Sequence, residues 1–102
     1  MTHAELSTGY QTAQIAHATA EFIFSKMLKA GNWKRTSNSL IVLEATNAEH
    51  LSQLLEQAKT LNIATAEFRE PDMGDEITAI AFAPSEETPI LLAGLPCAGR
   101  TP

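Results

Sequence analysis

The sequence predicts an α/β domain, and three observations carry this prediction. A continuous apolar run, Leu40–Leu43, is typical of a strand that is covered on both faces. Residues 51–61 repeat leucine and alanine with the i, i+3, i+4, i+7 spacing of an amphipathic helix. Two further strand-like stretches, 63–69 and 77–83, follow without a helix between them. Helices and strands in this order favour helices packed on a sheet.

The first helix is expected over residues 10–29, preceded by Ser7 or Thr8 as a hydroxyl cap for its first turn. Gly31 and Asn32 are expected to end this helix, because a glycine is a common helix stop. Its buried stripe is expected at Ala16, Ala20, Ile23 and Met27.

The connector at residues 70–76 joins the last two strands. A connection this short suits an antiparallel hairpin, because a parallel crossover needs about a dozen residues or more. The connector carries Glu70, Asp72, Asp75 and Glu76. Such oxygens can bind calcium or magnesium, but their spacing is not that of an EF-hand loop. We therefore expect a solvated turn and no metal.

Length and composition indicate one domain over residues 1–102. A hydrophobic fraction of 44% and a charged fraction of 19% are ordinary for a soluble globular protein. No apolar run approaches the ~20 residues that span a membrane, and the N-terminus lacks the features of a signal peptide. The single cysteine, Cys97, fits a reducing compartment. We expect a cytoplasmic protein that binds no membrane.

The formal net charge of −5 argues against indiscriminate nucleic-acid binding, which requires a basic surface. The most basic segment holds Lys26, Lys29, Lys34 and Arg35. These cations either offset the negative end of a helix dipole or form a local patch for RNA, and the sequence leaves both interpretations open.

The stretch Gly9–Ala18 is the part of the sequence that most favours a binding or catalytic site. Tyr10, Gln14 and His17 fall on one helix face, beside alanines small enough to let another molecule approach. Taken alone, His17 is either a hydrogen-bonded helix histidine or a general base. The sequence contains no glycine-rich phosphate loop with lysine, no metal-ligand spacing of histidines and no nucleophile motif.

The same stretch resembles the glycine-lysine-x-alanine-alanine-glutamine-x-x-histidine-alanine motif of type 2 peptidyl-tRNA hydrolases. The matched positions are Gly9, Ala13, Gln14, Ala16, His17 and Ala18. Tyr10 stands where the family has lysine. Asp72-Met73-Gly74 and Thr78 resemble that family's aspartate-alanine-glycine turn and the threonine that begins its last strand, although Asp75-Glu76 replaces the arginine-threonine-glutamine that follows the turn.

The resemblance implies a three-layer α/β/α fold with a small mixed sheet. In that family an apolar first strand ends in arginine-x-aspartate-leucine just before the glycine, whereas here His3–Leu6 takes that place and almost nothing precedes it. We therefore expect a truncated first strand beside the Leu40–Leu43 strand. An open strand edge of this kind is a template for association, so we expect a homo-oligomer such as a dimer.

The resemblance also implies a role in translation, as a hydrolase for the ester that joins a peptidyl group to the 3′ end of tRNA. An ester needs an attacking water, a group that orients or deprotonates the water, and a donor to the developing oxyanion. His17 or Asp72 matches the base, and Gln14, Thr78 or the backbone near Gly9 matches the donor. The reaction implies no metal and no other cofactor.

Substrate contacts are expected from Gly9, Tyr10, Lys34 and Arg35, with peptidyl-tRNA or another RNA as the partner. Tyr10 has a hydroxyl for hydrogen bonding and a ring that can stack on the terminal adenine. An alternative is a non-catalytic domain of the same fold that binds a nucleotide, an RNA or a protein. A third class is an assembly protein that completes its sheet with a strand from another chain.

Overall fold

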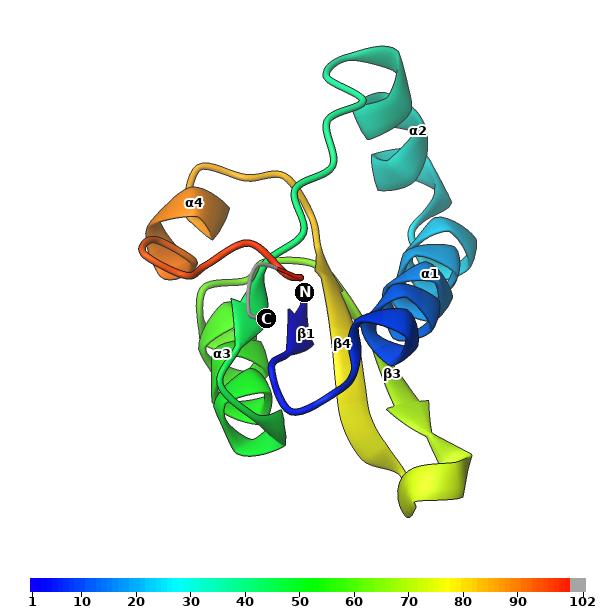
Figure 1. Cartoon of the computed structure of the whole chain (residues 1–102). Coiled ribbons are helices and arrows are strands. Elements are labelled where there is room, and N and C mark those ends of the chain that lie inside the picture. Colours follow the sequence, from blue (N-terminus) through cyan, green and yellow to red (C-terminus); the bar gives the residue numbers. More distant parts are fainter. Residues whose placement is uncertain (100–102) are drawn as a thin grey trace.

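The computed structural model describes residues 1–99, which form a sheet between two layers of helices (Figure 1). The helices are α1 (Thr8–Ser25), α2 (Met27–Arg35), α3 (Ala48–Thr60) and α4 (Thr88–Leu91). Helices α1 and α2 lie on one side of the sheet, and α3 and α4 lie on the other (Figure 1). The predicted α/β fold is confirmed. A single domain over 1–102 stays a prediction, since residues 100–102 lie outside the described part of the chain.

The four strands of residues 1–99 form two hydrogen-bonded pairs, and Met1 joins these pairs into one mixed sheet. They are β1 (Thr2–His3), β2 (Glu44–Ala45), β3 (Thr65–Glu70) and β4 (Glu76–Phe82). Strand β1 is parallel to β2, and β3 is antiparallel to β4. Met1 joins the pairs, because its ammonium donates to the Ile80 carbonyl (2.7 Å) and its carbonyl accepts from the Ile80 N–H (2.8 Å). The spatial order is therefore β2-β1-β4-β3.

Strand β1 is two residues long in this structure, and truncation of the family's first strand stays a prediction. It still occupies the place between β2 and β4, and the Thr2 N–H donates to the Leu43 carbonyl at 3.1 Å. The prediction of a strand over Leu40–Leu43 is wrong. Leu40 and Ile41 are 63% and 74% exposed, and strand β2 begins only at Glu44. A strand needs a paired neighbour, and β1 reaches no further along this segment than Leu43.

The first helix differs from its prediction in extent. Lys26 leaves the helical conformation (φ −129°, ψ 49°) and separates α1 from α2. Gly31 and Asn32 do not end the helix, which continues to Arg35. Helix α2 projects beyond the sheet (Figure 1), and its buried Ala30 packs in one cluster with Phe22 of α1.

The predicted buried stripe of α1 is also wrong: Ala16, Ala20, Ile23 and Met27 are exposed. The buried residues are Gln11, Gln14, Ala18 and Phe22. The stripe is rotated because two glutamines face the sheet, where their amides find hydrogen-bond partners. A buried polar group is tolerated when it is paired in this way.

Each face of the sheet has its own core. On the α3 side, Leu51, Leu54 and Leu55 pack with Ile77 and Ile80. On the α1 side, Phe22, Ala30, Ala66 and Ala83 pack together, with Ala64 and Ala81 beside them. Alanines on this face of β3 and β4 let α1 lie close to the sheet, and this approach brings the α1 glutamines within reach of strand side chains.

The predicted antiparallel hairpin is confirmed. The 3₁₀ turn Pro71–Met73 connects β3 to β4. Gly74 and Asp75 follow with φ of 65° and 60°, a left-handed pair that reverses the chain. The hairpin therefore holds the end of β3 beside the start of β4.

Candidate active site

Gln14 lies at the centre of the candidate site and is held at both ends of its amide. Its Nε2 donates to Glu70 Oε2 at 3.0 Å, and its Oε1 accepts from Thr78 Oγ1 at 2.9 Å. Gln14 is 3% exposed. With its carbonyl and one N–H engaged, the amide is fixed in orientation and has a second N–H available for another partner.

Thr78 is fully buried in β4, and its hydroxyl is shared between Gln14 and the Phe68 carbonyl (3.3 Å). The Thr78 carbonyl accepts from Thr2 Oγ1 at 2.8 Å. A hydroxyl has a single proton to donate, and this proton is used inside the protein. The Thr78 hydroxyl therefore holds the Gln14 amide in one orientation.

The sequence predicts Glu70 only as part of a solvated turn, whereas in the structure its carboxylate contacts Gln14 and so belongs to the site. It ends β3, and its Oε1 accepts from the Asp72 N–H at 3.4 Å while Oε2 holds Gln14. Glu70 comes directly before Pro71, and a glutamate in this position can cap the turn that follows. This position is the feature of the sequence that could have marked Glu70. Glu70 links the hairpin turn to α1.

Tyr10 precedes Gln14 by one helical turn and is 39% exposed. Partial burial raises the pKa of its phenol, and the nearby carboxylates of Glu70 and Asp72 raise that pKa further. The tyrosine therefore keeps its proton over the physiological range and remains a hydrogen-bond donor. Its position shows that the acidic turn and the start of α1 meet.

His17 follows Gln14 by one helical turn and is exposed. Its ring stacks on Phe68 of β3, with centroids 4.4 Å apart and planes 14° from parallel. This contact holds the imidazole against β3. Within residues 1–99, His17 and Asp72 form no hydrogen bond or ion pair with each other.

Gly9 is exposed in the first turn of α1, where Ser7 Oγ accepts from the Tyr10 N–H at 3.3 Å. The first N–H groups of a helix have no partner within the helix, so the Gly9 N–H stays available to a ligand. Lys34 and Arg35 lie elsewhere, in the last turn of α2. Helix α2 and the β3–β4 turn are at opposite ends of the molecule (Figure 1). The structure does not bring these two cations to Gln14.

Comparison with known proteins decides the family. The family model described as "Peptidyl-tRNA hydrolase PTH2" matches residues 2–91. This chain belongs to that family. A protein of Pyrobaculum aerophilum named "Peptidyl-tRNA hydrolase" is 37% identical over 68 residues, which cover 61% of this chain and 57% of that relative. The match thus spans somewhat more than half the length of the relative.

Compared with the family motif, this peptidyl-tRNA hydrolase-family chain departs most at Tyr10. A lysine there would be a cation facing Glu70 and Asp72, whereas the tyrosine leaves both carboxylates without that counter-charge. The replacement removes one cation that could attract phosphate and supplies a neutral donor in its place. The electrostatics of this end of α1 are therefore acidic.

A second buried polar group was missed by sequence reasoning. Gln11 Nε2 donates to the His3 carbonyl and to Glu44 Oε2, both at 3.0 Å. His3 is 1% exposed, and its Nε2 lies 3.9 Å from Glu76 Oε2. No local pattern marks these residues, because they converge from α1, β1, β2 and β4. They anchor α1 to the middle of the sheet one turn before Gln14.

Residues 1–99 contain no group of three or more histidine, cysteine, aspartate or glutamate side chains placed to hold a metal ion. None of the helices within this range has the length and apolar content required to cross a membrane.

Proposed function

We propose that this chain hydrolyses the ester between a peptidyl group and the 3′ end of tRNA. The observation that carries the proposal is the Gln14 amide, fixed between Glu70 and Thr78 on the helix face that also holds Tyr10 and His17. Membership of the peptidyl-tRNA hydrolase family supports the same reaction. A donor fixed before the substrate arrives is what stabilisation of an oxyanion requires.

The free N–H of the Gln14 amide donates to the ester carbonyl as it gains negative charge. Tyr10, which stays protonated beside Glu70 and Asp72, supplies a second donor or stacks on the terminal adenine. His17 accepts a proton from the attacking water, because its imidazole is accessible and held in place by Phe68. Asp72 remains the alternative base. Glu70 and Thr78 act through Gln14.

The tRNA partner meets an acidic site, so affinity has to come from elsewhere on the molecule. We propose that Lys34 and Arg35, which are exposed in the last turn of α2, contact phosphates distant from the ester. Such contacts are sensitive to salt, because each one releases counterions. We therefore propose weak, salt-dependent tRNA binding with Gly9 and Tyr10 at the 3′ end.

The test is release of the acyl group from N-acetyl-aminoacyl-tRNA, measured with the 102-residue chain and with a chelator present. We expect release without added metal, and a loss on the order of a hundredfold in His17→Ala and in Gln14→Ala, as for positioned acid–base and oxyanion groups. Gln53→Ala, an exposed change on α3, is the matched control and should retain full activity. Wild-type release no faster than spontaneous hydrolysis would reject the enzyme and favour the binding module.

A further inference from the structure

The junction of α1 and α2 carries an apolar surface that residues 1–99 do not cover. Phe24, in the last turn of α1, is 82% exposed, and Met27 and Leu28, in the first turn of α2, are 71% and 90% exposed. The three side chains come from residues 24–28 and are therefore close together in space, and we call them the junction patch. Large apolar side chains gathered on a surface mark a site for a partner or a membrane.

Positive charge accompanies the junction patch. Lys26 lies between Phe24 and Met27, Lys29 directly follows the patch, and two more cations end α2. Residues 22–43 hold these four of the 7 Lys and Arg residues of the chain and none of its 12 Asp and Glu residues. None of the four forms an ion pair within residues 1–99. The segment is therefore a cationic region on a chain whose net charge is −5.

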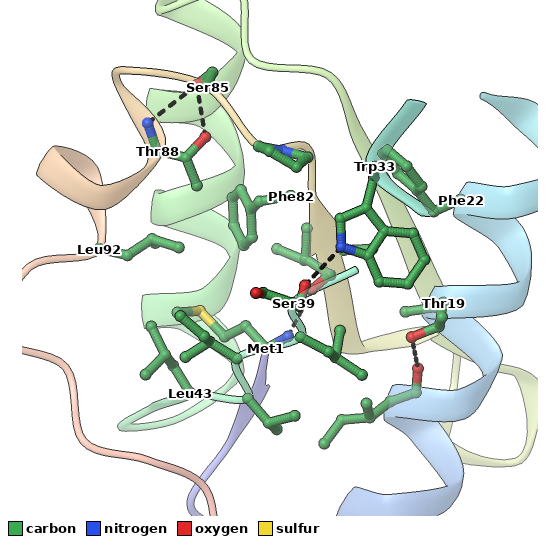
Figure 2. Close-up of a pocket in the computed structure, with 18 of the residues that line it drawn as sticks. Met1, Thr19, Phe22, Trp33, Ser39, Leu43, Phe82, Ser85, Thr88 and Leu92 are labelled. Carbon is green, nitrogen blue, oxygen red and sulfur yellow. Dashed lines mark hydrogen bonds between the residues drawn. The ribbon is translucent and has the colours of Figure 1, made fainter. Parts of the chain in front are cut away.

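Helix α2 is held from its inner side, so the junction patch is a fixed feature of the surface. Ala30 is buried and packs with Phe22 of α1. Trp33 lines an apolar cavity of about 420 Å³, and its Nε1 donates to the Ser39 carbonyl at 2.6 Å (Figure 2). The residues of the junction patch belong neither to this cluster nor to the lining of the cavity. The helix is thus anchored without them.

Apolar and cationic character together distinguish the candidate partners of the junction patch. RNA would pair with the lysines but would leave Met27 and Leu28 in water, because bases stack on aromatic and not on aliphatic side chains. A second copy in a symmetric dimer would bring the cations of both chains together, and like charges repel. A protein would need an acidic groove shaped to α2. A membrane with anionic lipids offers negative headgroups and an apolar layer, and it accepts a projecting helix without a matching groove.

We propose that the junction patch docks this protein on the surface of an anionic membrane. Phe24, Met27 and Leu28 enter the boundary between headgroups and acyl chains, and Lys26 and Lys29 contact the negative headgroups. A contact this small binds weakly and reversibly, unlike a spanning helix. The expectation that the chain binds no membrane rested on the absence of a long apolar run, which a contact at the interface does not require.

The orientation of the docked molecule follows from the fold. Helix α2 projects beyond the sheet, whereas the β3–β4 turn lies at the opposite end of the molecule (Figure 1). This turn carries Asp72, and Glu70 beside it holds the Gln14 amide. Docking through the junction patch therefore keeps the acidic end of the molecule, and the candidate active site with it, away from the negative headgroups. The distribution of charge favours this orientation over the reverse one.

The probe is a vesicle of phosphatidylcholine with about 30% phosphatidylserine, compared with a vesicle of phosphatidylcholine alone in a co-sedimentation assay. We expect the 102-residue chain to bind the anionic vesicle about tenfold or more tightly, and to lose this preference as the salt concentration rises. Lys26→Gln and Lys29→Gln should each weaken binding to the anionic vesicle about fivefold, which is the effect of one cation near such a surface. Lys59→Gln, on α3, is the matched control and should change binding less than about twofold.

A matched pair of apolar variants tests insertion separately from charge. Leu28 and Ile90 are 90% and 77% exposed, so neither change to serine removes a buried side chain. Leu28→Ser should weaken binding to the anionic vesicle about tenfold, because a large apolar side chain no longer enters the lipid. Ile90→Ser, on α4, should not change this binding.

Several outcomes would overturn the proposal. Equal binding to both vesicles would remove the role of the cations, and no sedimentation with either would leave the junction patch to a protein partner. Self-association that Leu28→Ser abolishes, without vesicle binding, would assign the patch to a second copy. Binding of tRNA that Leu28→Ser weakens, without vesicle binding, would assign the patch to RNA. Vesicle binding requires no turnover, so this result is independent of the hydrolase proposal.

Discussion

The buried amine of Met1 makes the stability of this protein depend on pH in a predictable direction. Its pKa is lowered from 8.0 to about 6, so between these values the folded protein binds fewer protons than the unfolded chain. Stability therefore rises with pH through this window, is complete above the unfolded pKa and is lost as pH falls toward the folded pKa. Each tenfold change in acidity corresponds to about 1.4 kcal/mol, which gives about 2.7 kcal/mol in all.

The assay is the free energy of urea unfolding, measured at a series of pH values from below the folded pKa to above the unfolded one. Other ionisable groups of the protein contribute to the same pH curve and would mask the amine in a single measurement. An Nα-acetylated chain removes the titrating amine and leaves the side chains unchanged. Met1 lines an apolar cavity of about 420 Å³, and this cavity gives the acetyl group room without displacement of β1.

The difference between the two pH curves isolates the amine. We expect the unmodified chain to lose about 2 kcal/mol more than the acetylated chain between pH 8 and pH 6. Parallel curves for the two proteins would refute the reasoning, because they would show that the amine is solvated and that Met1 does not close the sheet against Ile80.

Three further predictions concern the site and the core. Thr78→Val should lower the rate of ester hydrolysis about tenfold or more with KM for tRNA unchanged, and Thr78→Ser should restore the rate, since the hydroxyl orients Gln14. Tyr10→Lys adds a cation beside Glu70, and its contact with a phosphate should steepen the slope of log affinity against log salt concentration by about one unit. Filter binding of tRNA at several salt concentrations measures this slope. Ile80→Ala removes a fully buried side chain and should lower the free energy of unfolding by about 2–5 kcal/mol in urea titrations.

The parts of the fold that follow from local patterns could be predicted from the sequence. The apolar stripe at residues 51–61 predicts a helix that buries one face. Leu51, Leu54 and Leu55 are buried in α3, as this pattern predicts. The hairpin follows from a short connector with Pro71 and Gly74 at turn positions. Each of these signals lies within a few residues of the structure it predicts.

The face of α1 could not be predicted in this way, because hydrophobicity assigns glutamines to the surface. Gln11 and Gln14 are buried because Glu44, Glu70 and Thr78 satisfy their amides, and these partners come from strands distant in sequence. The motif resemblance had marked Gln14 and Thr78 as site residues. It did not mark Glu70, whose role depends on how the turn packs against α1.

Strand β1 connects the candidate active site with the middle of the sheet. Thr2 donates to the Thr78 carbonyl, and Thr78 in turn holds Gln14. One residue earlier, Met1 makes the paired hydrogen bonds with Ile80 that join β1 to β4. Neighbouring residues at the start of the chain therefore support the site and join the two strand pairs. Buried backbone and hydroxyl groups at this place are paired, as stable burial of polar groups requires.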